Sequence, residues 1–89
     1  MRTFEYSNRF LRDYKLCKKQ GKNMGKLHTI LKMLETEEAI PPQYKDHPLK
    51  HNWQGYRDLH IEPDWILIYQ IKDNKIVLLA ATGTHTHTL

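Results

Sequence analysis

Histidine is unusually frequent in this chain of 89 residues, which contains His28, His47, His51, His60, His85 and His87. The unperturbed pKa of histidine, about 6.5, lets an imidazole take up and release protons near neutral pH. RNA cleavage needs a base for the ribose 2′-OH, an acid for the departing 5′-oxygen and a cation beside the phosphoryl oxygens. These side chains therefore allow RNA cleavage by acid–base catalysis, with no cofactor and no metal.

Each histidine also has a simpler interpretation. A lone histidine is usually a surface or hydrogen-bonded structural residue, and this interpretation is favoured for His28 and His51. The pair His85 and His87 has the H-x-H spacing that can chelate zinc or copper, but no CxxC or HExxH spacing supports it. We therefore predict no metal site.

Composition narrows the class of protein. Lys and Arg total 14 against 10 for Asp and Glu, so the net charge is +4. A basic surface attracts phosphate backbones, membrane headgroups or acidic partners, although solubility alone explains this charge equally well. A chain of this length is expected to form one domain over 1–89, with a two-layer core and no deep cofactor cleft. An enzyme with a nucleotide cofactor is thereby disfavoured.

Several features predict a cytoplasmic protein without a membrane segment. The only cysteine, Cys17, cannot form an intrachain disulfide, which fits a reducing compartment, and its place in an apolar helical stripe predicts a buried structural thiol. The first ten residues contain no apolar core of signal-peptide length. The longest apolar stretches, 65–69 and 76–81, are too short to span a bilayer.

Hydrophobic periodicity and turn residues divide the chain into elements. We predict an edge strand at 3–6, a helix from an N-cap at Ser7 to about Gln20, a second helix from about Asn23 to Glu37, and strands at 54–61, 64–72 and 75–82. Pro41 and Pro42 stop the second helix, and a loop of about a dozen residues follows. Asp73-Asn74 marks a two-residue turn. This order predicts an α+β fold in which the helices pack on one face of an antiparallel meander and leave the other partly open.

The first strand of the meander separates polar from apolar side chains. Alternation places Tyr56, Asp58 and His60 on one face, with Leu59 and Ile61 on the other. Because the apolar pair should meet the helices, we expect Asp58 and His60 on the open face. His85 follows the last strand, and antiparallel pairing can bring it to the same place.

Four motifs in order carry a resemblance over nearly the whole chain: DHPL, YRD-x-H, EPDW-ILIY and TGTH. Together with the segment 44–71 that contains three of them, they resemble the YafQ-like toxins of the RelE/ParE superfamily. The resemblance implies a RelE-like fold. It also implies a ribosome-dependent endoribonuclease, an mRNA interferase that cuts mRNA in the ribosomal A site by 2′-oxygen attack without metal and so inhibits translation.

The resemblance assigns site residues by matching positions. The implied catalytic positions are His47, His60, Asp64 and His85, with Asp58 and Trp65 in supporting positions. His85 is expected to act as acid or phosphate stabiliser, Asp64 and His60 are candidates for the base, and His47 would orient or protonate.

The remaining expected substrate contacts come from basic residues and from the chain end. Lys45, Lys50 and Arg57 are candidates for phosphate binding. Leu89 stands where the family usually ends in phenylalanine, and leucine stacks on a base less well than an aromatic ring. This departure bears on rate or codon preference more than on the type of reaction.

Partners follow from the resemblance as well. It implies a DinJ-like antitoxin in a 2:2 heterotetramer, the 70S ribosome, mRNA, and operator DNA reached through the antitoxin. Three other functions stay open at this point: a non-catalytic RNA- or ribosome-binding module, a metal-dependent nuclease, and a co-repressor that works mainly with its antitoxin.

Overall fold

The computed structural model describes all residues from Met1 to Leu89 and contains one five-stranded sheet of order β1-β5-β4-β3-β2. The strands are β1 Thr3–Tyr6, β2 His47–Pro48, β3 Arg57–Glu62, β4 Trp65–Lys72 and β5 Ile76–Gly83. The helices are α1 Asn8–Lys19, α2 Met24–Glu35 and α3 His85–Thr88, with 3₁₀ turns η1 at Pro42–Tyr44 and η2 at His51–Trp53. The predicted α+β class is confirmed, and β1 lies at a sheet edge, parallel to β5.

Local sequence signals set the start and end of the helical pair. The Ser7 hydroxyl accepts from the Phe10 amide at 2.9 Å and donates to the Ala80 carbonyl at 2.7 Å, so this N-cap also ties α1 to β5. Beyond α1, Gly21 adopts a φ of +79°. The second helix ends at Glu35, two residues before the predicted end, because Glu37 turns the chain with a φ of +63°.

The main core lies between the helices and one face of the sheet. The helices contribute Phe10, Cys17, Leu27, Ile30 and Leu34, and the strands contribute Leu59, Ile61, Trp65, Leu67, Tyr69, Val77 and Leu79. The predicted inward direction of Leu59 and Ile61 is confirmed. The Cys17 thiol is buried, as predicted, and this burial raises its pKa. None of the helices is long and apolar enough to cross a bilayer.

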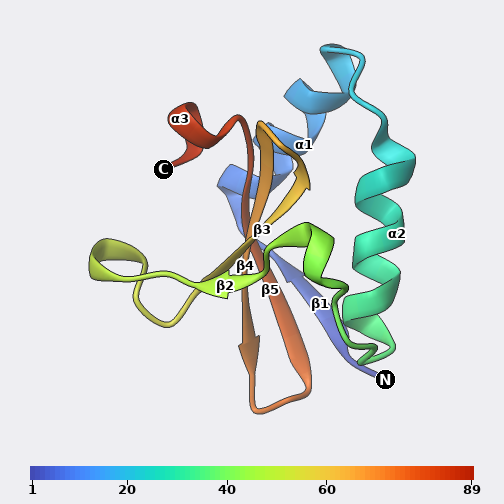
Figure 1. Ribbon diagram of the computed structural model, residues 1–89, viewed down its shortest axis with the longest axis vertical. Coiled ribbons are helices and arrows are strands. Elements are labelled where there is room, and N and C mark those ends of the chain that lie inside the picture. Colours follow the sequence, from blue (N-terminus) through green and yellow to red (C-terminus); the bar gives the residue numbers. More distant parts are fainter.

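The opposite face is more covered than the sequence predicted. A second buried cluster, Ile66, Ile68, Ala80 and Ala81, packs against Leu49, Trp53 and Tyr56 of the loop before β3. Figure 1 shows this loop on the other side of the sheet from α2. The predicted strand at 54–61 therefore begins only at Arg57, because the loop folds back and the Leu49 amide donates to the Tyr56 carbonyl at 2.9 Å.

Two tight turns connect the meander. Asp73 and Asn74 both have positive φ, 52° and 57°, as a two-residue hairpin turn requires. Between β3 and β4 the chain turns at Pro63 and Asp64, and the register shifts between His60 and Glu62. This irregularity lies next to the candidate site.

Candidate active site

Asp58 occupies the centre of the candidate site. Its side chain is 1% exposed although β3 carries it on the face turned away from α1 and α2. The expectation that Asp58 lies on an open face is thus wrong in one respect: the face is correct, but the covering segments bury the carboxylate.

Three histidines surround this carboxylate, and the sheet register explains how they meet. His47 on β2 pairs with Asp58 on β3, and its Nδ1 lies 3.3 Å from Asp58 Oδ1. His60 follows two residues along β3. Its neighbour across the ladder is Ile66, which in turn pairs with Gly83, two residues before His85. The rings of His60 and His85 stack with centroids 5.9 Å apart and planes 20° apart.

The buried Asp58 carboxylate receives no hydrogen bonds that would offset the loss of its hydration. Neither of its oxygens has a hydrogen-bond partner. Burial raises the pKa of Asp58. The three histidines act in the opposite direction, His47 most and His85 least, but their effect on this pKa is smaller than that of burial. A buried charge without hydrogen bonds is costly, and the three neighbouring histidines only partly offset that cost.

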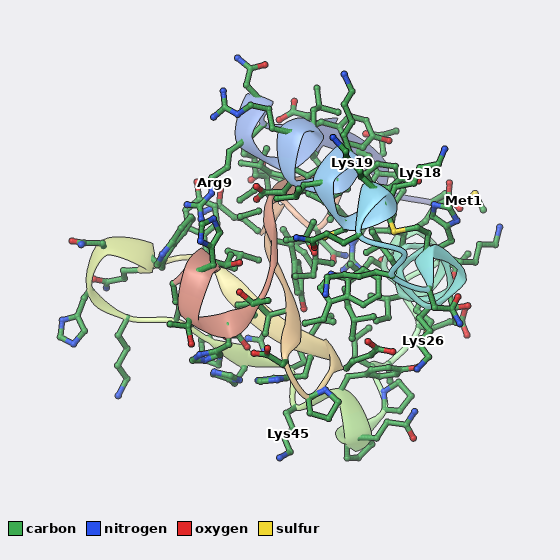
Figure 2. The ribbon with its side chains drawn as sticks, turned by 90° about the horizontal axis from the view of Figure 1, so that it is seen from above. Met1, Arg9, Lys18, Lys19, Lys26 and Lys45 are labelled. Carbon is green, nitrogen blue, oxygen red and sulfur yellow. The ribbon has the colours of Figure 1, made fainter.

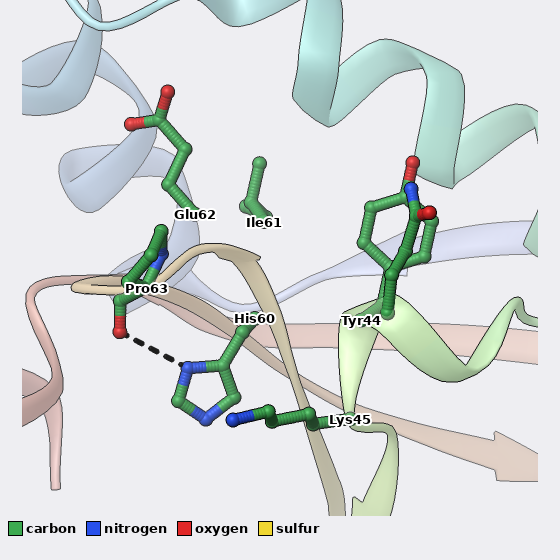
Figure 3. Close-up of a pocket in the computed structure, with 7 residues that line it drawn as sticks. Tyr44, Lys45, His60, Ile61, Glu62 and Pro63 are labelled. Atoms are coloured by element: carbon green, nitrogen blue, oxygen red, sulfur yellow. Dashed lines mark hydrogen bonds between the residues drawn. The ribbon is translucent and has the colours of Figure 1, made fainter.

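Backbone carbonyls set the tautomers of two histidines. His60 Nδ1 lies 3.2 Å from the Pro63 carbonyl (Figure 3), and His47 Nδ1 lies 2.7 Å from the Lys45 carbonyl. A carbonyl only accepts, so Nδ1–H is the donor in both contacts. The Nε2 atoms are left free for proton transfer to or from a substrate.

The other expected catalytic residue lies apart from this cluster. Asp64 is exposed in the turn between β3 and β4, directly after the Pro63 that holds His60. It is not among the charges that act on Asp58. The structure therefore brings together His47, His60 and His85 around Asp58, and leaves Asp64 at the rim.

Two residues expected to touch substrate have structural roles. Arg57 binds both carboxylate oxygens of Asp46, at 3.2 and 3.3 Å, and this contact raises the Arg57 pKa. The Tyr69 hydroxyl donates to the same carboxylate at 2.6 Å. Trp65 is 1% exposed, and its Nε1–H donates to Thr82 Oγ1 at 2.9 Å. The Arg57 side chain is still 39% exposed, and the part of Arg57 and Trp65 in substrate binding stays a prediction.

The remaining expected contacts are exposed. Lys45 and Lys50 flank β2, and Leu89 ends the chain after α3 with 47% of its surface accessible. These three side chains are free to approach a ligand.

Sequence reasoning missed a group on α1 that holds the C-terminal segment. Arg9 Nη2 donates to the Thr88 carbonyl at 2.8 Å, and the guanidinium lies 5.8 Å from the centroid of the Trp53 ring. Asp13, which pairs with Arg9 at 3.6 Å, accepts from the Thr82 amide at 3.1 Å. The i,i+4 spacing of Arg9 and Asp13 was the only signal in the sequence. This pair fixes both ends of the segment that carries His85.

Gly83 allows Thr88 of α3 to pack closely against the end of β5. Its φ is +154°, and a Cβ at this position would lie 2.8 Å from Thr88 Oγ1. We expect Gly83→Ala to lower the free energy of unfolding by at least about 1 kcal/mol, seen as a lower melting temperature, and to displace His85. Gly21→Ala is a matched control, because Gly21 also has positive φ but nothing within 4 Å of the added Cβ. Equal effects of both substitutions on the His85 NMR signals would contradict this role.

The buried carboxylate predicts a specific pH dependence of stability. As pH rises from below 3.8, the ordinary pKa of aspartate, the unfolded chain loses the Asp58 proton first, while the folded protein keeps it to higher pH. The folded state then binds more protons, so this group makes stability fall with rising pH until the raised pKa is passed. We expect the difference in free energy of unfolding between Asp58→Asn and wild type to increase, in favour of Asp58→Asn, as pH rises from 3.8 to the raised pKa. Urea unfolding of both proteins from pH 3.5 to 7 measures it, with Asp73→Asn, an exposed aspartate, as control. Parallel curves for Asp58→Asn and wild type would refute it.

Comparison with known proteins identifies relatives over the full length. The family model described as a bacterial toxin of a type II toxin–antitoxin system, YafQ, matches residues 2–89. The mRNA interferase toxin YafQ of Escherichia coli strain B/BL21-DE3 is 48% identical over 85 residues, covering 94% of this chain and 91% of that protein. The family model thus covers the region that contains the histidine cluster.

Solved structures share the fold closely. The crystal structure of YafQ from E. coli BL21(DE3) superposes with a TM-score of 0.91 at 45% identity, covering 98% of this chain and 97% of that one. YafQ in the E. coli DinJ–YafQ complex gives 0.88 at 46% identity, with 98% and 97% covered. A metal-bound toxin from Helicobacter pylori gives 0.89 at 38% identity, with 98% of each chain covered.

Proposed function

Because this chain belongs to the YafQ family of bacterial type II toxins, we propose that it is an mRNA interferase that cuts mRNA in the ribosomal A site. The observation that carries the proposal is the grouping of His47, His60 and His85 around buried Asp58. Three imidazoles at one place supply the base, the acid and the positive charge that cleavage of a phosphodiester requires.

The contacts suggest a division of roles. The free Nε2 of His60 takes the proton from the ribose 2′-OH, and the 2′-oxygen attacks phosphorus. The bond to the 5′-oxygen breaks, and protonated His85 gives its proton to that oxygen, leaving a 2′,3′-cyclic phosphate. His47 orients the phosphate or protonates it, and Asp64 contacts the ribose.

Basic side chains support binding to the ribosome. Lys18 and Lys19 at the end of α1 are exposed, and Figure 2 shows them on the helical pair. Lys26 on α2 is also exposed, and its Nζ pairs with Glu62 Oε2 at 2.8 Å. Phosphate backbones attract such a surface and make binding sensitive to salt. We propose that this surface contacts ribosomal RNA, while exposed Lys45 and Lys50 approach the mRNA backbone.

Partners and location complete the proposal. E. coli YafQ has been crystallised with DinJ, and we propose a DinJ-like antitoxin for this chain in a 2:2 heterotetramer that binds operator DNA through the antitoxin. The place of action is the cytoplasm, where translating ribosomes are found. The chain acts as a single domain over 1–89.

Metal independence is part of the proposal and needs its own control. A relative from H. pylori is metal-bound. In this chain no group of three or more His, Cys, Asp or Glu side chains is arranged to hold a metal ion. We expect cleavage to persist in EDTA at a magnesium level that keeps ribosomes intact.

Primer extension on a translated mRNA tests the function. We expect cuts in register with codons, only when ribosomes are present. Cutting of free RNA at the same rate would remove the ribosome from the proposal, and cutting abolished by chelation of transition metals would favour a metal-dependent nuclease. Growth arrest without cleavage would favour a ribosome-binding module. An inert chain that binds operator DNA only with its antitoxin would favour a co-repressor.

A further inference from the structure

The strand that carries His47 is too short to hold that side chain in place by itself. β2 consists of His47 and Pro48 and lies at an edge of the sheet (Figure 1). Proline has no amide proton to give to a neighbouring strand, and half of the His47 side chain is exposed. An edge segment with so few contacts opens easily, so a further contact must fix it.

The residue before His47 supplies such a contact. The Asp46 side chain is only 19% exposed, and both of its carboxylate oxygens accept hydrogen bonds. The Tyr69 hydroxyl donates to Oδ1 at 2.6 Å, and Arg57 donates to Oδ1 through Nε at 3.2 Å and to Oδ2 through Nη2 at 3.3 Å. We call these three hydrogen bonds the Asp46 anchor. Burial and the bond to this carboxylate raise the pKa of Tyr69, so its hydroxyl keeps the proton that it donates.

The anchor has a rigid base on the helix side of the sheet. Arg57 and Tyr69 are direct neighbours across β3 and β4, and Tyr69 is 1% exposed in the main core. Successive residues along a strand point to opposite faces of the sheet. A carboxylate held on the helix side therefore directs the next side chain to the other face, where His47 Nδ1 lies 3.3 Å from Asp58 Oδ1.

We propose that the Asp46 anchor fixes the register of β2 and thereby positions His47 for catalysis. The inference rests on the proposed function, in which His47 orients or protonates the phosphate. A shift of β2 by one residue would turn the imidazole to the wrong face of the sheet. Even a displacement of about 1 Å at a catalytic group can cost about 10²-fold in rate. Asp46 and Tyr69 are thus positioning residues that act through His47.

Removal of one oxygen atom tests the anchor. Tyr69→Phe deletes the hydroxyl that donates to Asp46 and keeps the ring in the core. We expect the single-turnover rate of mRNA cleavage on ribosomes to fall about tenfold, the order that one hydrogen bond to a charged group provides. In a protein that already carries His47→Ala, Tyr69→Phe should lower the rate no further, because the anchor then has no imidazole to position. Equal losses in both backgrounds would overturn the proposal.

Tyr14→Phe is the matched control. The Tyr14 hydroxyl also forms one hydrogen bond, with His28 Nε2 at 2.7 Å, but this bond joins α1 to α2. Both substitutions remove a bonded hydroxyl and keep the aromatic ring. We expect Tyr14→Phe to cleave at the wild-type rate. A similar loss of cleavage in Tyr14→Phe would assign the effect to general stability and would also overturn the proposal.

The imidazole ¹⁵N NMR signals of His47 separate failure of the anchor from failure of the proposed function, because they require no mRNA. They show which ring nitrogen carries the proton of the neutral form. In wild type we expect Nδ1–H, which faces the Lys45 carbonyl at 2.7 Å, and in Tyr69→Phe a mixture of Nδ1–H and Nε2–H. This change in a protein that does not cut mRNA would refute the proposed function alone. Unchanged His47 signals in Tyr69→Phe would refute the anchor, whether or not the protein cuts mRNA.

Discussion

Replacement of His85 by alanine is expected to lower ribosome-dependent cleavage by about 10²-fold or more, the usual contribution of a general acid or base. His85 is exposed and begins α3, so the loss follows from chemistry rather than from a damaged core. Its ring stacks on that of His60 and acts on the charge of Asp58, so the substitution removes one of the three imidazoles at the site. Primer extension under single-turnover conditions measures the rate.

His87→Ala is the control for His85. His87 lies on the same short helix and is also exposed, and its substitution removes the same side chain. We expect His87→Ala to cleave at the wild-type rate. If His85→Ala cleaved as fast as His87→Ala, the catalytic assignment would be lost, and the chain would act by binding alone.

Asp58→Asn is expected to lower cleavage by about 10²-fold as well, while making the folded protein more stable at neutral pH. The amide has the shape of the carboxylate but carries no charge, and the cost of burying an ion without hydrogen bonds disappears. Catalysis suffers because the substitution removes the negative charge that lies among the three histidines.

The pH–rate profile separates this role from simple damage to the fold. Because burial raises the pKa of Asp58, wild-type activity should decline as pH falls through that pKa, and Asp58→Asn should lack this decline. A misfolded fraction cannot produce that difference, because it would lower the activity by the same factor at every pH. Thermal unfolding on the same samples should show an equal or higher melting temperature. A variant that is both less active and less stable, with an unmoved profile, would make Asp58 a packing residue.

Much of the fold follows from local signals in the sequence. Ser7 caps α1 with its own hydroxyl, and Asp73-Asn74 adopts the positive φ values of a hairpin turn. Alternation also assigned Leu59 to the helix side and Asp58 to the other. Each of these depends on residues close in sequence or on the period of a strand, which a single sequence displays directly.

The site was predictable only where strand pairing decides it. His60 and His85 meet because β4 pairs with both β3 and β5, an arrangement implied by two short hairpins. The burial of Asp58 depends instead on how the segment before β3 folds over the sheet, and no repeating pattern in the sequence indicates the path of that segment. The contact of Arg9 with the Thr88 carbonyl joins residues 79 positions apart, and the engagement of Arg57 by Asp46 needs a specific loop path.

The parallel pairing of β1 with β5 has a consequence for the life of the chain in the cell. Thr3 to Tyr6 find their only strand neighbour in Ile76 to Leu79, so β1 can join the sheet only after β5 has been synthesised. A growing polypeptide that lacks β5 and α3 therefore has neither the complete sheet nor the imidazole of His85. By the proposed mechanism, such an incomplete chain cannot cut mRNA.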